Sequence, residues 1–572
     1  MSAPLPPADT EALLAQIEAA AGMDRLRALA ADPAVVGQDL IAAVVEEAAK
    51  FSHAWLGPLN TAADREGCRL DQGRVRTAPG HKAAWDAYLE AGWLGIDQPV
   101  AHGGQDLPIV VLAACQALFD RSCVAFGMLP TAQRAAARLL AAHADEATKA
   151  EWLPRIVSGE WAATICISEP DAGSDVGRIR TLAAPAEDGS WSITGEKIWI
   201  SYGDHDLTTR IGHCLLARTP DAPPGAAGLS LFLVPDTPEP AGARNPIVVR
   251  RLEEKLGLHG SPTCALGFEG AKGRLIGTLG RGLAQLFTMI TTMRLMVAVQ
   301  GLALATGATD VALAYAEDRR QGGPADRPAV AIAEHADIQR MLLGMSGRVE
   351  VLRGLILTAA VQADLSRLET DPVARDCAQA LVGWLLPIAK TLGGEAAFDL
   401  SSDAIQVLGG AGYVKDWPVE QFLRDSRVFT IFEGASGIQA LDLLQRRLRR
   451  DGGQGLKAFM SLARSDLAAA AGLAEAPALE RSLDLLQDAA DRLSGGRADA
   501  PAYPFLRLAG LAAMGWVAIR LIQRDGGVCE RRVAAAARYW FQELEPKAVL
   551  EHALTCADPA RLDLFQAVRR GA

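Results

Sequence analysis

The sequence lacks the cysteine patterns that a disulfide framework or a zinc site requires. Its nine cysteines are scattered along 572 residues, with no CxxC pair and no cluster with histidine. Reduced and mostly buried thiols are therefore the expected state, and no metal site is predicted.

The sequence also lacks an excess of positive charge. Its formal net charge is -11, and 22% of its residues are charged, so that nucleic acid is an unlikely partner. One basic run, residues 445–450, is favoured as a solvated helix end. A C-terminal module that binds nucleic acid remains an alternative, which a salt-dependent shift on DNA would test.

Signals for secretion, for membrane insertion and for a nicotinamide cofactor are missing as well. No basic segment followed by an apolar core begins the chain, and the longest apolar segment, residues 282–316, is interrupted by Arg294 and Asp310. This segment is expected to be a buried helix, and the protein is expected to be cytoplasmic, with no membrane partner. No GxGxxG motif follows a strand and opens a helix, which disfavours an NAD-linked enzyme.

The patterning of apolar residues predicts a mainly α protein with an inserted β domain. Residues 1–160 read as an N-terminal helical domain, and residues 161–280 as a β domain of short runs separated by Gly, Pro and Asp. Residues 281–450 predict a helical bundle with long segments at 283–319, 331–369 and 374–409, and residues 451–572 a C-terminal helical extension. In the first domain, His53, His81 and His102 are expected at surface or cap positions.

One carboxylate, Glu433, has two interpretations from its surroundings alone. It follows the apolar run Val-Phe-Thr-Ile-Phe and precedes Gly434. If that run is buried, desolvation raises the pKa of Glu433 and makes it a candidate base at a carbon acid. Alternatively, Glu433 is an acid at the N-cap of the helix that follows.

Two segments of the β domain carry further candidate binding residues. The run ISEPDAGSD, residues 167–175, predicts a tight turn whose backbone N–H groups and hydroxyls can grip a polar ligand. In EKIWIS, residues 196–201, Trp199 and Ser201 are expected to lie opposite Ile198 and Ile200. Trp199 could cover a flat aromatic cofactor or pack in the core.

Six motifs together resemble the acyl-CoA dehydrogenase family in order and approximate spacing. Any one of them is a weak signal, but six in order over about half of the chain are a strong one. The chain is most similar to the longer branch of the family with a C-terminal helical extension, which includes 3-methylmercaptopropionyl-CoA dehydrogenases. The motifs are ISEPDAGSD (167–175), GEKIWIS (195–201), KLGLHGSPT (255–263), YAEDRRQ (315–321), QVLGGAGY (406–413) and FEGASGIQ (432–439).

The resemblance implies an FAD-dependent α,β-dehydrogenation of an acyl-CoA thioester. Glu433 matches the base that removes the α-proton, while the β-hydrogen leaves as hydride to N5 of FAD. The backbone N–H of Glu433 and a ribityl hydroxyl would stabilise the enolate oxygen, at roughly 3–4 kcal/mol per donor. Electron-transfer flavoprotein would be the electron acceptor, and fatty acid metabolism the setting.

The resemblance also assigns the remaining site residues. Substrate-binding positions are Ser174, Thr291, Arg294 and Gly434; for Arg294 an internal ion pair is equally plausible. The cofactor-binding positions near the flavin are Ile165, Ile167, Ser168, Trp199 and Ser201. Those that would reach the FAD of a neighbouring subunit, implying a homodimer or homotetramer, are Arg319, His335, Gln406, Gly409 and Gly410, with Ala435 and Gly437 beside the base.

Two departures from the family pattern affect the cofactor. Gln321-Gly322-Gly323 replaces an aromatic-Gly step, and Ala435 and Gly437 stand where Thr and Gln are common. Contacts of these two residues with FAD can therefore be only backbone or van der Waals contacts.

The sequence leaves the acceptor and the acyl group open. An acyl-CoA oxidase that uses O2 has the same base and remains an alternative. The acyl group is expected to be short or medium in length, and a 3-methylthiopropionyl-type group fits the resemblance.

Overall fold

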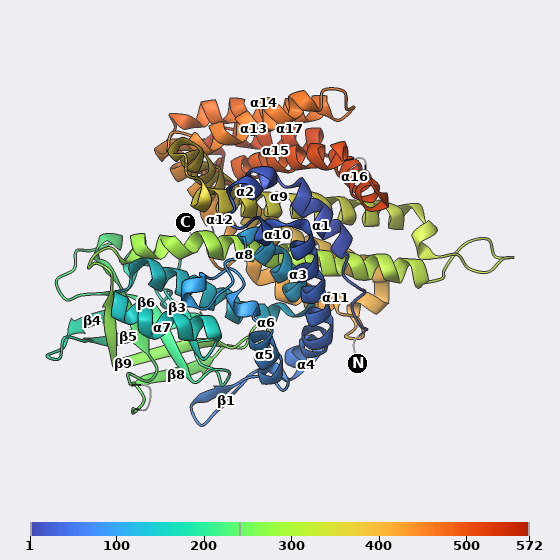
Figure 1. The fold of residues 1–572 in the computed structure, drawn as a ribbon. Coiled ribbons are helices and arrows are strands. Elements are labelled where there is room, and N and C mark those ends of the chain that lie inside the picture. The colour runs from blue at the N-terminus through green and yellow to red at the C-terminus, as the bar shows by residue number, and fades with distance from the viewer. Residues whose placement is uncertain (1–2, 240–241, 525, 570–572) are drawn as a thin grey trace. The chain divides into compact units, whose positions relative to one another are not determined.

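The computed structural model describes residues 3–239, 242–524 and 526–569 (Figure 1). The chain forms two compact units, which are described separately. Unit 1 contains residues Lys50–Leu107 and Leu118–Met296, and unit 2 contains Ser2–Ala49, Pro108–Ala117 and Val297–Ala572. The predicted class, mainly α with an inserted β domain of the acyl-CoA dehydrogenase type, is confirmed.

The chain before the sheet is helical apart from one hairpin. This hairpin pairs β1 (Arg69–Asp71) with β2 (Arg74–Arg76) and turns at Gln72 and Gly73, both with positive φ. Only helices were predicted here, and the turn was missed, although a glycine at a left-handed position favours it. The helices are α1 (Thr10–Ala19), α2 (Met23–Leu29), α3 (Gln38–Phe51), α4 (Gly57–Glu66), α5 (His81–Glu90), α6 (Ile109–His143) and α7 (Glu146–Ser158).

Unit 1 contains a barrel-like sheet. Among the described strands, β6, β4, β5, β9 and β7 pair in a closed ring, to which β3 is added beside β6 and β8 beside β9. Strands β3, β5, β6, β7 and β9 fall on the predicted runs, whereas β4 and β8 were missed because one ends in proline and the other is an edge strand with two arginines. The strands are β3 (Trp161–Cys166), β4 (Leu182–Pro185), β5 (Trp191–Ser201), β6 (Arg210–Arg218), β7 (Leu229–Pro235), β8 (Ile247–Leu252) and β9 (Thr263–Ile276).

Strand β7 lies between two apolar clusters in the core of unit 1. All its residues are buried, because apolar side chains from alternate positions enter two different clusters. Leu231 and Leu233 pack with Trp152 of α7, whereas Phe232 packs with Ile193 and Phe268 of the sheet. A strand covered on both faces reads as a continuous apolar run, as LSLFLVP does.

The bundle of unit 2 is built on three long helices. They are α8 (Gly282–Asp318), which enters unit 2 at Val297, α9 (Ala336–Leu368) and α10 (Pro372–Leu408). Helices α8 and α10 approach closely at Gly301, where an added Cβ would lie 2.3 Å from the carbonyl carbon of Gly393. Only glycine permits this approach of two backbones.

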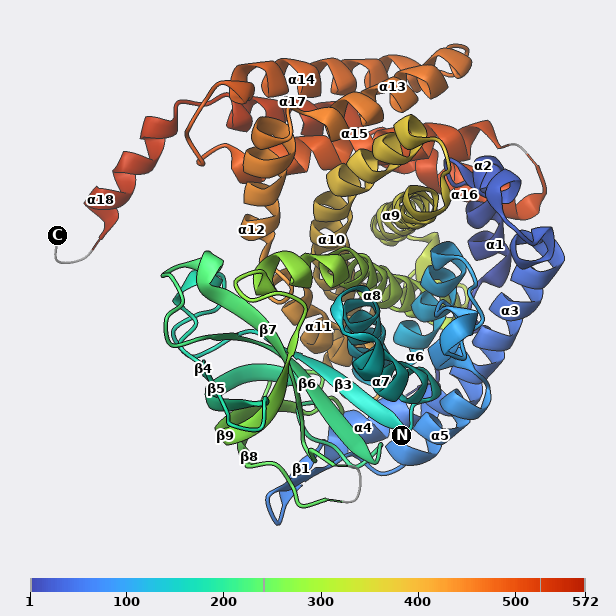
Figure 2. The same cartoon turned by 60° about the vertical axis from the view of Figure 1, so that its left-hand side comes forward.

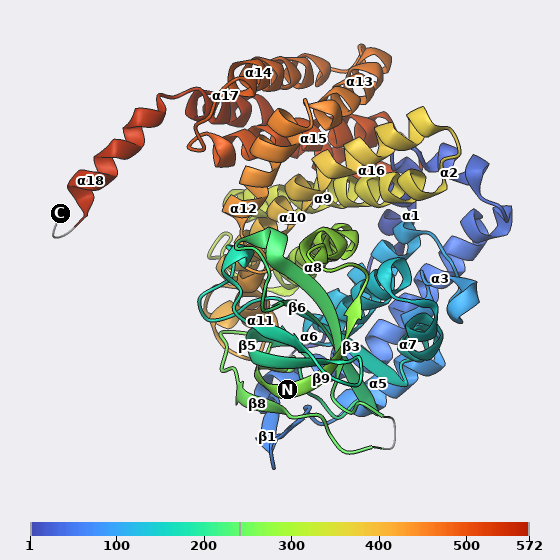
Figure 3. The same ribbon diagram turned by 90° about the vertical axis from the view of Figure 1, so that its left-hand side faces the viewer.

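The rest of unit 2 consists of shorter helices. Figures 2 and 3 show α18 extending away from α14 and α17. The helices are α11 (Val419–Ser426), α12 (Ser436–Leu441), α13 (Gln454–Ala469), α14 (Ala476–Ser494), α15 (Ala502–Gln523), α16 (Val528–Phe541), α17 (Leu544–Thr555) and α18 (Leu564–Val568), with a π-helical segment, η10 (Asp442–Arg450), after α12.

The basic run of η10 is mostly paired within the chain. Arg446 forms an ion pair with Asp442 at 3.4 Å, Arg447 with Asp451 at 3.2 Å. Arg449 donates to the backbone carbonyl of Leu493 at 3.1 Å. These cations are engaged in holding the helix and its neighbours, so the expectation of a solvated helix end is only partly right, and a free basic surface is not formed by these three residues.

Three described helices are long and apolar enough to cross a membrane by composition. They are Ile109–His143, Gly282–Asp318 and Ala502–Gln523. In each, the most apolar window is largely covered by protein, to 94%, 61% and 89% respectively. Burial of this extent is typical of core helices, as was expected of residues 282–316.

Candidate active site

The predicted site residues form two groups, one in each unit. Unit 1 contains those of the β domain and the first part of α8, and unit 2 contains Glu433 with the residues assigned to a neighbouring cofactor. Each group is built by its own local packing.

In unit 1, the end of β3 is joined to β5 around a buried ion pair. The ammonium of Lys197 lies 2.8 Å from the carboxylate of Glu169, and both side chains are buried. Lys197 also donates to the carbonyls of Ile167 at 3.1 Å and Leu216 at 2.8 Å. The backbone N–H of Ile198 donates to the carbonyl of Ser168 at 2.9 Å. These bonds fix the segment that contains Ile167 and Ser168.

Burial and charge act in opposite directions on this pair. Burial alone would raise the pKa of Glu169, but Lys197 and hydrogen bonds from Arg180 and Thr181 lower it. Burial lowers the pKa of Lys197, and Glu169 opposes that shift. With its pKa lowered, Glu169 is anionic at neutral pH, and the lysine neutralises it. Sequence reasoning missed this pair, although Lys197 falls on the inward side of an alternating strand.

The side chain of Trp199 is exposed to solvent, and its backbone is left-handed. It has a positive φ of 63° and is 57% exposed, whereas Ile200 next to it is buried. The pairing of β5 with β9 shifts register between Lys197 and Ile200, so the simple alternation expected for this strand is interrupted. A non-glycine residue in left-handed backbone costs about 1 kcal/mol or more and persists only where its surroundings fix it. Trp199 is therefore not a core tryptophan.

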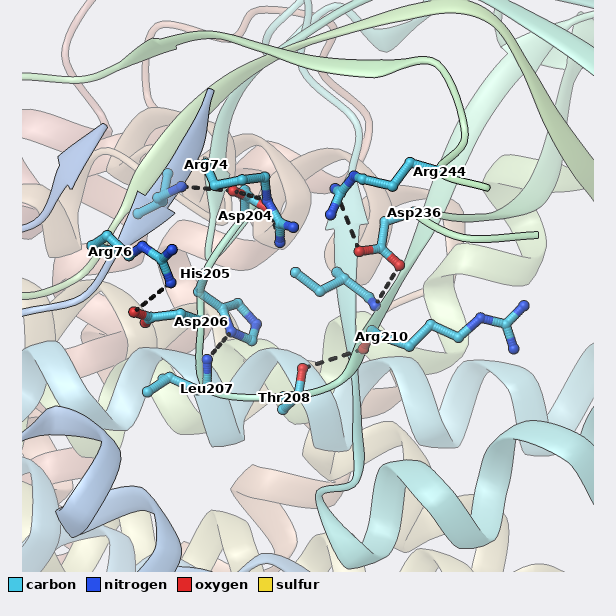
Figure 4. A network of polar contacts seen from close by, with 12 residues as sticks. Arg74, Arg76, Asp204, His205, Asp206, Leu207, Thr208, Arg210, Asp236 and Arg244 are labelled. Atoms are coloured by element: carbon cyan, nitrogen blue, oxygen red, sulfur yellow. Dashed lines mark hydrogen bonds and ion pairs between the residues drawn. The ribbon is translucent and has the colours of Figure 1, made fainter. Parts of the chain in front are cut away.

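The turn after Ser201 holds the end of β5 against the β1–β2 hairpin through side-chain contacts (Figure 4). The carboxylate of Asp204 accepts from Arg74 at 2.7 Å and from the N–H of Val75 at 2.7 Å. Asp206 accepts from the hydroxyl of Thr77 at 2.8 Å. Two carboxylates thus tie this turn to the β1–β2 hairpin and its continuation.

The burial of His81 differs from what the sequence predicted. This histidine was expected at a surface or cap position, and it does begin α5, but it is buried and stacks on Phe126. Burial lowers the pKa of His81 to about 4, and the pKa values of His205 and His213 to about 3. All three are therefore neutral at pH 7.

The candidate substrate residues of unit 1 differ in exposure. Ser174 is exposed in the loop between β3 and β4, beside an ion pair of Arg178 with Asp175 at 2.8 Å. Thr291 and Arg294 are half-buried on α8. Ile165 and Ile167, in contrast, pack partly against the core of unit 1.

In unit 2, Glu433 lies in a short loop between a 3-10 turn, η9 (Arg427–Thr430), and α12. The N-cap of α12 is Ala435, so the interpretation of Glu433 as an N-cap acid is wrong. Glu433 is half-buried, and the run before it is not uniformly buried, because Phe429 is buried while Ile431 is 56% exposed. The predicted rise in the pKa of Glu433 stays a prediction.

The backbone of this loop is held by α10 and α12. Gly394 of α10 lies so close that an added Cβ would be 2.9 Å from the carbonyl oxygen of Phe429. The ammonium of Lys390 donates to the carbonyl of Gly434 at 2.7 Å. The amide of Gln439 donates to the carbonyls of Glu433 at 3.0 Å and Gly434 at 3.2 Å.

Sequence reasoning missed Lys390 and Gln439. The signal for Lys390 was present, because a single lysine in the apolar stretch WLLPIAKTLGG of a long helix needs a buried partner. Gln439 carried no such signal.

Two cofactor candidates of unit 2, Arg319 and His335, lie between α8 and α9. Arg319 donates to the side chain of Gln321 at 3.4 Å, and His335 contacts the carbonyl of Gln321 at 2.8 Å. The three therefore lie together in the loop between α8 and α9.

The glycine-rich end of α10 is open. Gln406, Gly409 and Gly410 are exposed, and no atom lies within 4 Å of a Cβ added to either glycine. Gly437 is equally open, and Ala435 is half-buried. Small residues at these positions leave room for another group to approach the backbone.

One group of possible metal ligands corrects the expectation that no cysteine clusters with histidine. His552 and Cys556 share a face of the end of α17, and with Asp488 they place three ligand atoms within 4.8 Å of one another. His552 is 2.7 Å from the carboxylate of Asp488, which also accepts from Arg492 at 2.9 Å. Hydrogen bonds and an ion pair account for this arrangement, and it is the only such group among the described residues.

Three domain models of one family match most of the chain. The N-terminal domain of acyl-CoA dehydrogenases matches residues 42–160, their middle domain residues 164–271, and their C-terminal domain residues 280–448. The last of these includes Glu433 and both residues that hold its loop.

Individual relatives agree with the family models. The chain is 39% identical to 3-methylmercaptopropionyl-CoA dehydrogenase of Ruegeria pomeroyi over 83% of this chain and 84% of that protein. It is 31% identical to a butyryl-CoA dehydrogenase of Syntrophomonas wolfei over 74% of this chain and 73% of that protein.

Solved structures share the fold over nearly the whole length. ACDH-11 of Caenorhabditis elegans, in complex with C11-CoA, has a TM-score of 0.79 at 20% identity and covers 99% of this chain and 96% of its own. An acyl-CoA dehydrogenase of Bacillus anthracis, complexed with FAD, has a TM-score of 0.76 at 19% identity, with 93% and 92% covered. The chain therefore belongs to the acyl-CoA dehydrogenase family, FAD-dependent oxidoreductases that act on CH–CH groups.

Proposed function

We propose that the protein oxidises an acyl-CoA thioester to the trans-2-enoyl-CoA, with Glu433 as the base that removes the α-proton. The observation that carries this proposal is the setting of Glu433: a half-buried carboxylate whose backbone is fixed by two buried side chains, within the segment that matches the family's C-terminal domain. A base must be held in place to act on a carbon acid as weak as a thioester.

The residues of the chain fit FAD. Trp199 presents an exposed aromatic face beside the fixed segment with Ile167 and Ser168, as a flat isoalloxazine ring requires. Open backbone at Gly409, Gly410 and Gly437 suits close approach of the adenosine half. FAD, when bound, supplies the acceptor for the β-hydrogen.

The chain's own part in the reaction is proton removal and stabilisation of charge. Glu433 takes the α-proton, and negative charge develops on the thioester oxygen. A backbone N–H aimed at that oxygen is worth roughly 3–4 kcal/mol, and the N–H of Glu433 is the proposed donor. Ser174, Thr291, Arg294 and Gly434 are proposed to contact the substrate.

The substrate is proposed to be a short or medium acyl-CoA, with a 3-methylthiopropionyl-type group first among candidates. This rests on the 39% identity to 3-methylmercaptopropionyl-CoA dehydrogenase. A cytoplasmic enzyme that passes electrons to electron-transfer flavoprotein is the proposed setting.

A homodimer or homotetramer is proposed, in which Arg319, His335 and Gln406 reach the FAD of a second copy. Its support is exposed apolar surface next to the open glycines, since Tyr413 is 84% exposed and Val414 46% exposed.

The first experiment mixes the purified flavoprotein anaerobically with a panel of acyl-CoAs and follows the visible flavin band, for the wild type and Glu433→Gln. We expect one thioester to bleach the wild type, and the variant to bleach about 10³- to 10⁴-fold more slowly, because general-base catalysis contributes up to that much. Equal bleaching in both would place the base elsewhere. Hydrogen peroxide formed at a comparable rate in air would favour the oxidase instead.

A further inference from the structure

Two side chains hold the loop that contains Glu433, and both are completely buried. Lys390 of α10 and Gln439 of α12 have exposed fractions of 0%. Together they donate to two successive backbone carbonyls, those of Glu433 and Gly434. Because a buried donor is costly to leave without an acceptor, each of these side chains resists movement of the loop.

The loop has a backbone that needs such support. Glu433 has a φ of 53° and Gly434 a φ of 91°. Left-handed backbone costs a residue such as glutamate about 1–2 kcal/mol, so a relaxed loop would tend to leave it. The two donors bind the carbonyls of the strained residue and of its neighbour, which are the groups that would rotate if the loop relaxed.

The direction of the Glu433 side chain follows from this backbone. With φ positive, its Cβ and its N–H both point differently from those of a residue in extended or helical backbone. Fixing the peptide groups after Glu433 therefore fixes both the carboxylate and the N–H that the reaction is proposed to use.

We propose that Lys390 and Gln439 are positioning residues for the proton-removal step, acting through the peptide groups that follow Glu433. The inference rests on the proposed role of Glu433 and extends it. Loss of either donor should slow proton removal without changing the affinity for the substrate. A displacement of the order of 1 Å at a reacting group costs up to about 100-fold in rate.

The test uses the holoenzyme with Lys390→Met and Gln439→Met, both of which remove a donor and keep an apolar stem of similar length. Thr391→Val is the matched control. It lies next to Lys390 on α10, is also fully buried, and its hydroxyl has no hydrogen-bond partner among the described residues.

The first readout is steady-state kinetics with the best thioester from the panel. We expect kcat to fall about 10- to 100-fold in both variants, with KM within about twofold of the wild type. Thr391→Val should match the wild type in both. A rise in KM with kcat unchanged would overturn the proposal, because it would place the residues in ground-state binding.

The second readout isolates proton removal. An acyl-CoA with sulfur in place of the β-carbon has no β C–H to lose, so it can only be deprotonated, and its enolate beside oxidised flavin gives an absorption band at long wavelength. We expect less of this band, at equal saturation and pH, in Lys390→Met and Gln439→Met. A band equal to that of Thr391→Val would overturn the proposal, since a purely structural role leaves the folded fraction's chemistry unchanged.

The outcomes separate this inference from the proposed function. If the wild type forms no enolate band and bleaches with no thioester, the function itself fails. If the wild type does both and the two variants do as well as Thr391→Val, only the positioning role fails. If Lys390→Met loses its flavin, Gln439→Met decides the result by the same two readouts.

Discussion

Two site candidates, one in each unit, have left-handed backbone. Trp199 in unit 1 and Glu433 in unit 2 have φ values of 63° and 53°. Each is close in the chain or in space to a completely buried lysine, Lys197 or Lys390, and these are the only completely buried lysines among the described residues. Both lysines donate to backbone carbonyls of the adjoining segments.

The two lysines differ in the segments that they hold. Lys197 is paired with the carboxylate of Glu169 and so holds two strands by charge as well as by hydrogen bonds. Lys390 and Gln439 bind the loop of Glu433 through its carbonyl oxygens. We therefore expect the loss of Lys197 to weaken the packing of two strands, and the loss of Lys390 to displace the loop that contains Glu433.

Lys197→Met should give the largest loss of stability and break the first side of this comparison. It leaves the buried carboxylate of Glu169 without its cation, which typically costs about 3–5 kcal/mol. Thermal unfolding followed by flavin release would measure it. The control is Lys272→Met, whose ion pair with Asp188 is half-exposed and should contribute little, because water screens exposed charges. Equal melting temperatures for the two variants would contradict the assignment.

Acid should weaken unit 1 through its buried histidines. The folded pKa of His81 is about 4, below the unfolded value of about 6.5. The unfolded chain therefore binds the proton first, and stability falls as the pH drops from about 6.5 to about 4. At pH 5 this loss is about 2 kcal/mol for His81. In unit 2, burial raises the pKa of Glu350, with Arg353 opposing it, so its contribution is lost as the pH rises.

The variant that isolates this effect is His81→Phe. We expect the difference in the free energy of unfolding between pH 8 and pH 5, from urea titrations of the holoenzyme, to be smaller by about 2 kcal/mol than in the wild type. His53→Gln, at an exposed position of α3's C-terminal continuation, is measured alongside as a histidine replacement outside the core. An unchanged difference in His81→Phe would show that His81 titrates normally.

Trp199→Gly should have the smallest effect on stability and sharpen the comparison on the side of unit 1. Glycine adopts positive φ without strain, and the lost side chain is largely exposed, so the free energy of unfolding of the apoprotein should change by no more than about 1 kcal/mol. FAD should bind about tenfold more weakly, because an aromatic contact is worth about 0.5–1.5 kcal/mol. Flavin titration of the apoprotein measures this, and unchanged affinity would remove Trp199 from the cofactor site.

Periodicity and motif order predicted most of the architecture. The three long helices of the bundle begin and end within a few residues of the predicted segments, because apolar residues at helical spacing define them. The hairpin at Gln72 and Gly73 was missed because its strands are short and mostly exposed.

The site was predicted less completely than the fold. Glu433 was singled out as a candidate because it follows an apolar run and because its segment, FEGASGIQ, resembles a motif of the family. The residues that hold its loop were not predicted. Lys390 and Gln439 meet the loop only through the packing of α10 and α12. The positive φ of Trp199 was not predicted either, because the alternating pattern of a strand does not indicate where a bulge occurs.

The first helices of the chain contact elements that come much later in the sequence. Gln16 of α1 hydrogen-bonds Glu350, and Arg25 of α2 pairs with Glu369 at 2.6 Å, across 334 and 344 residues of sequence. Arg520 of α15 donates to the carbonyl of Ala19 at 3.0 Å. During synthesis on the ribosome these helices lack their partners in α9 and α15 until more than half of the chain has emerged. Their docking is therefore a late event in folding, slowed by the entropy of closing long loops.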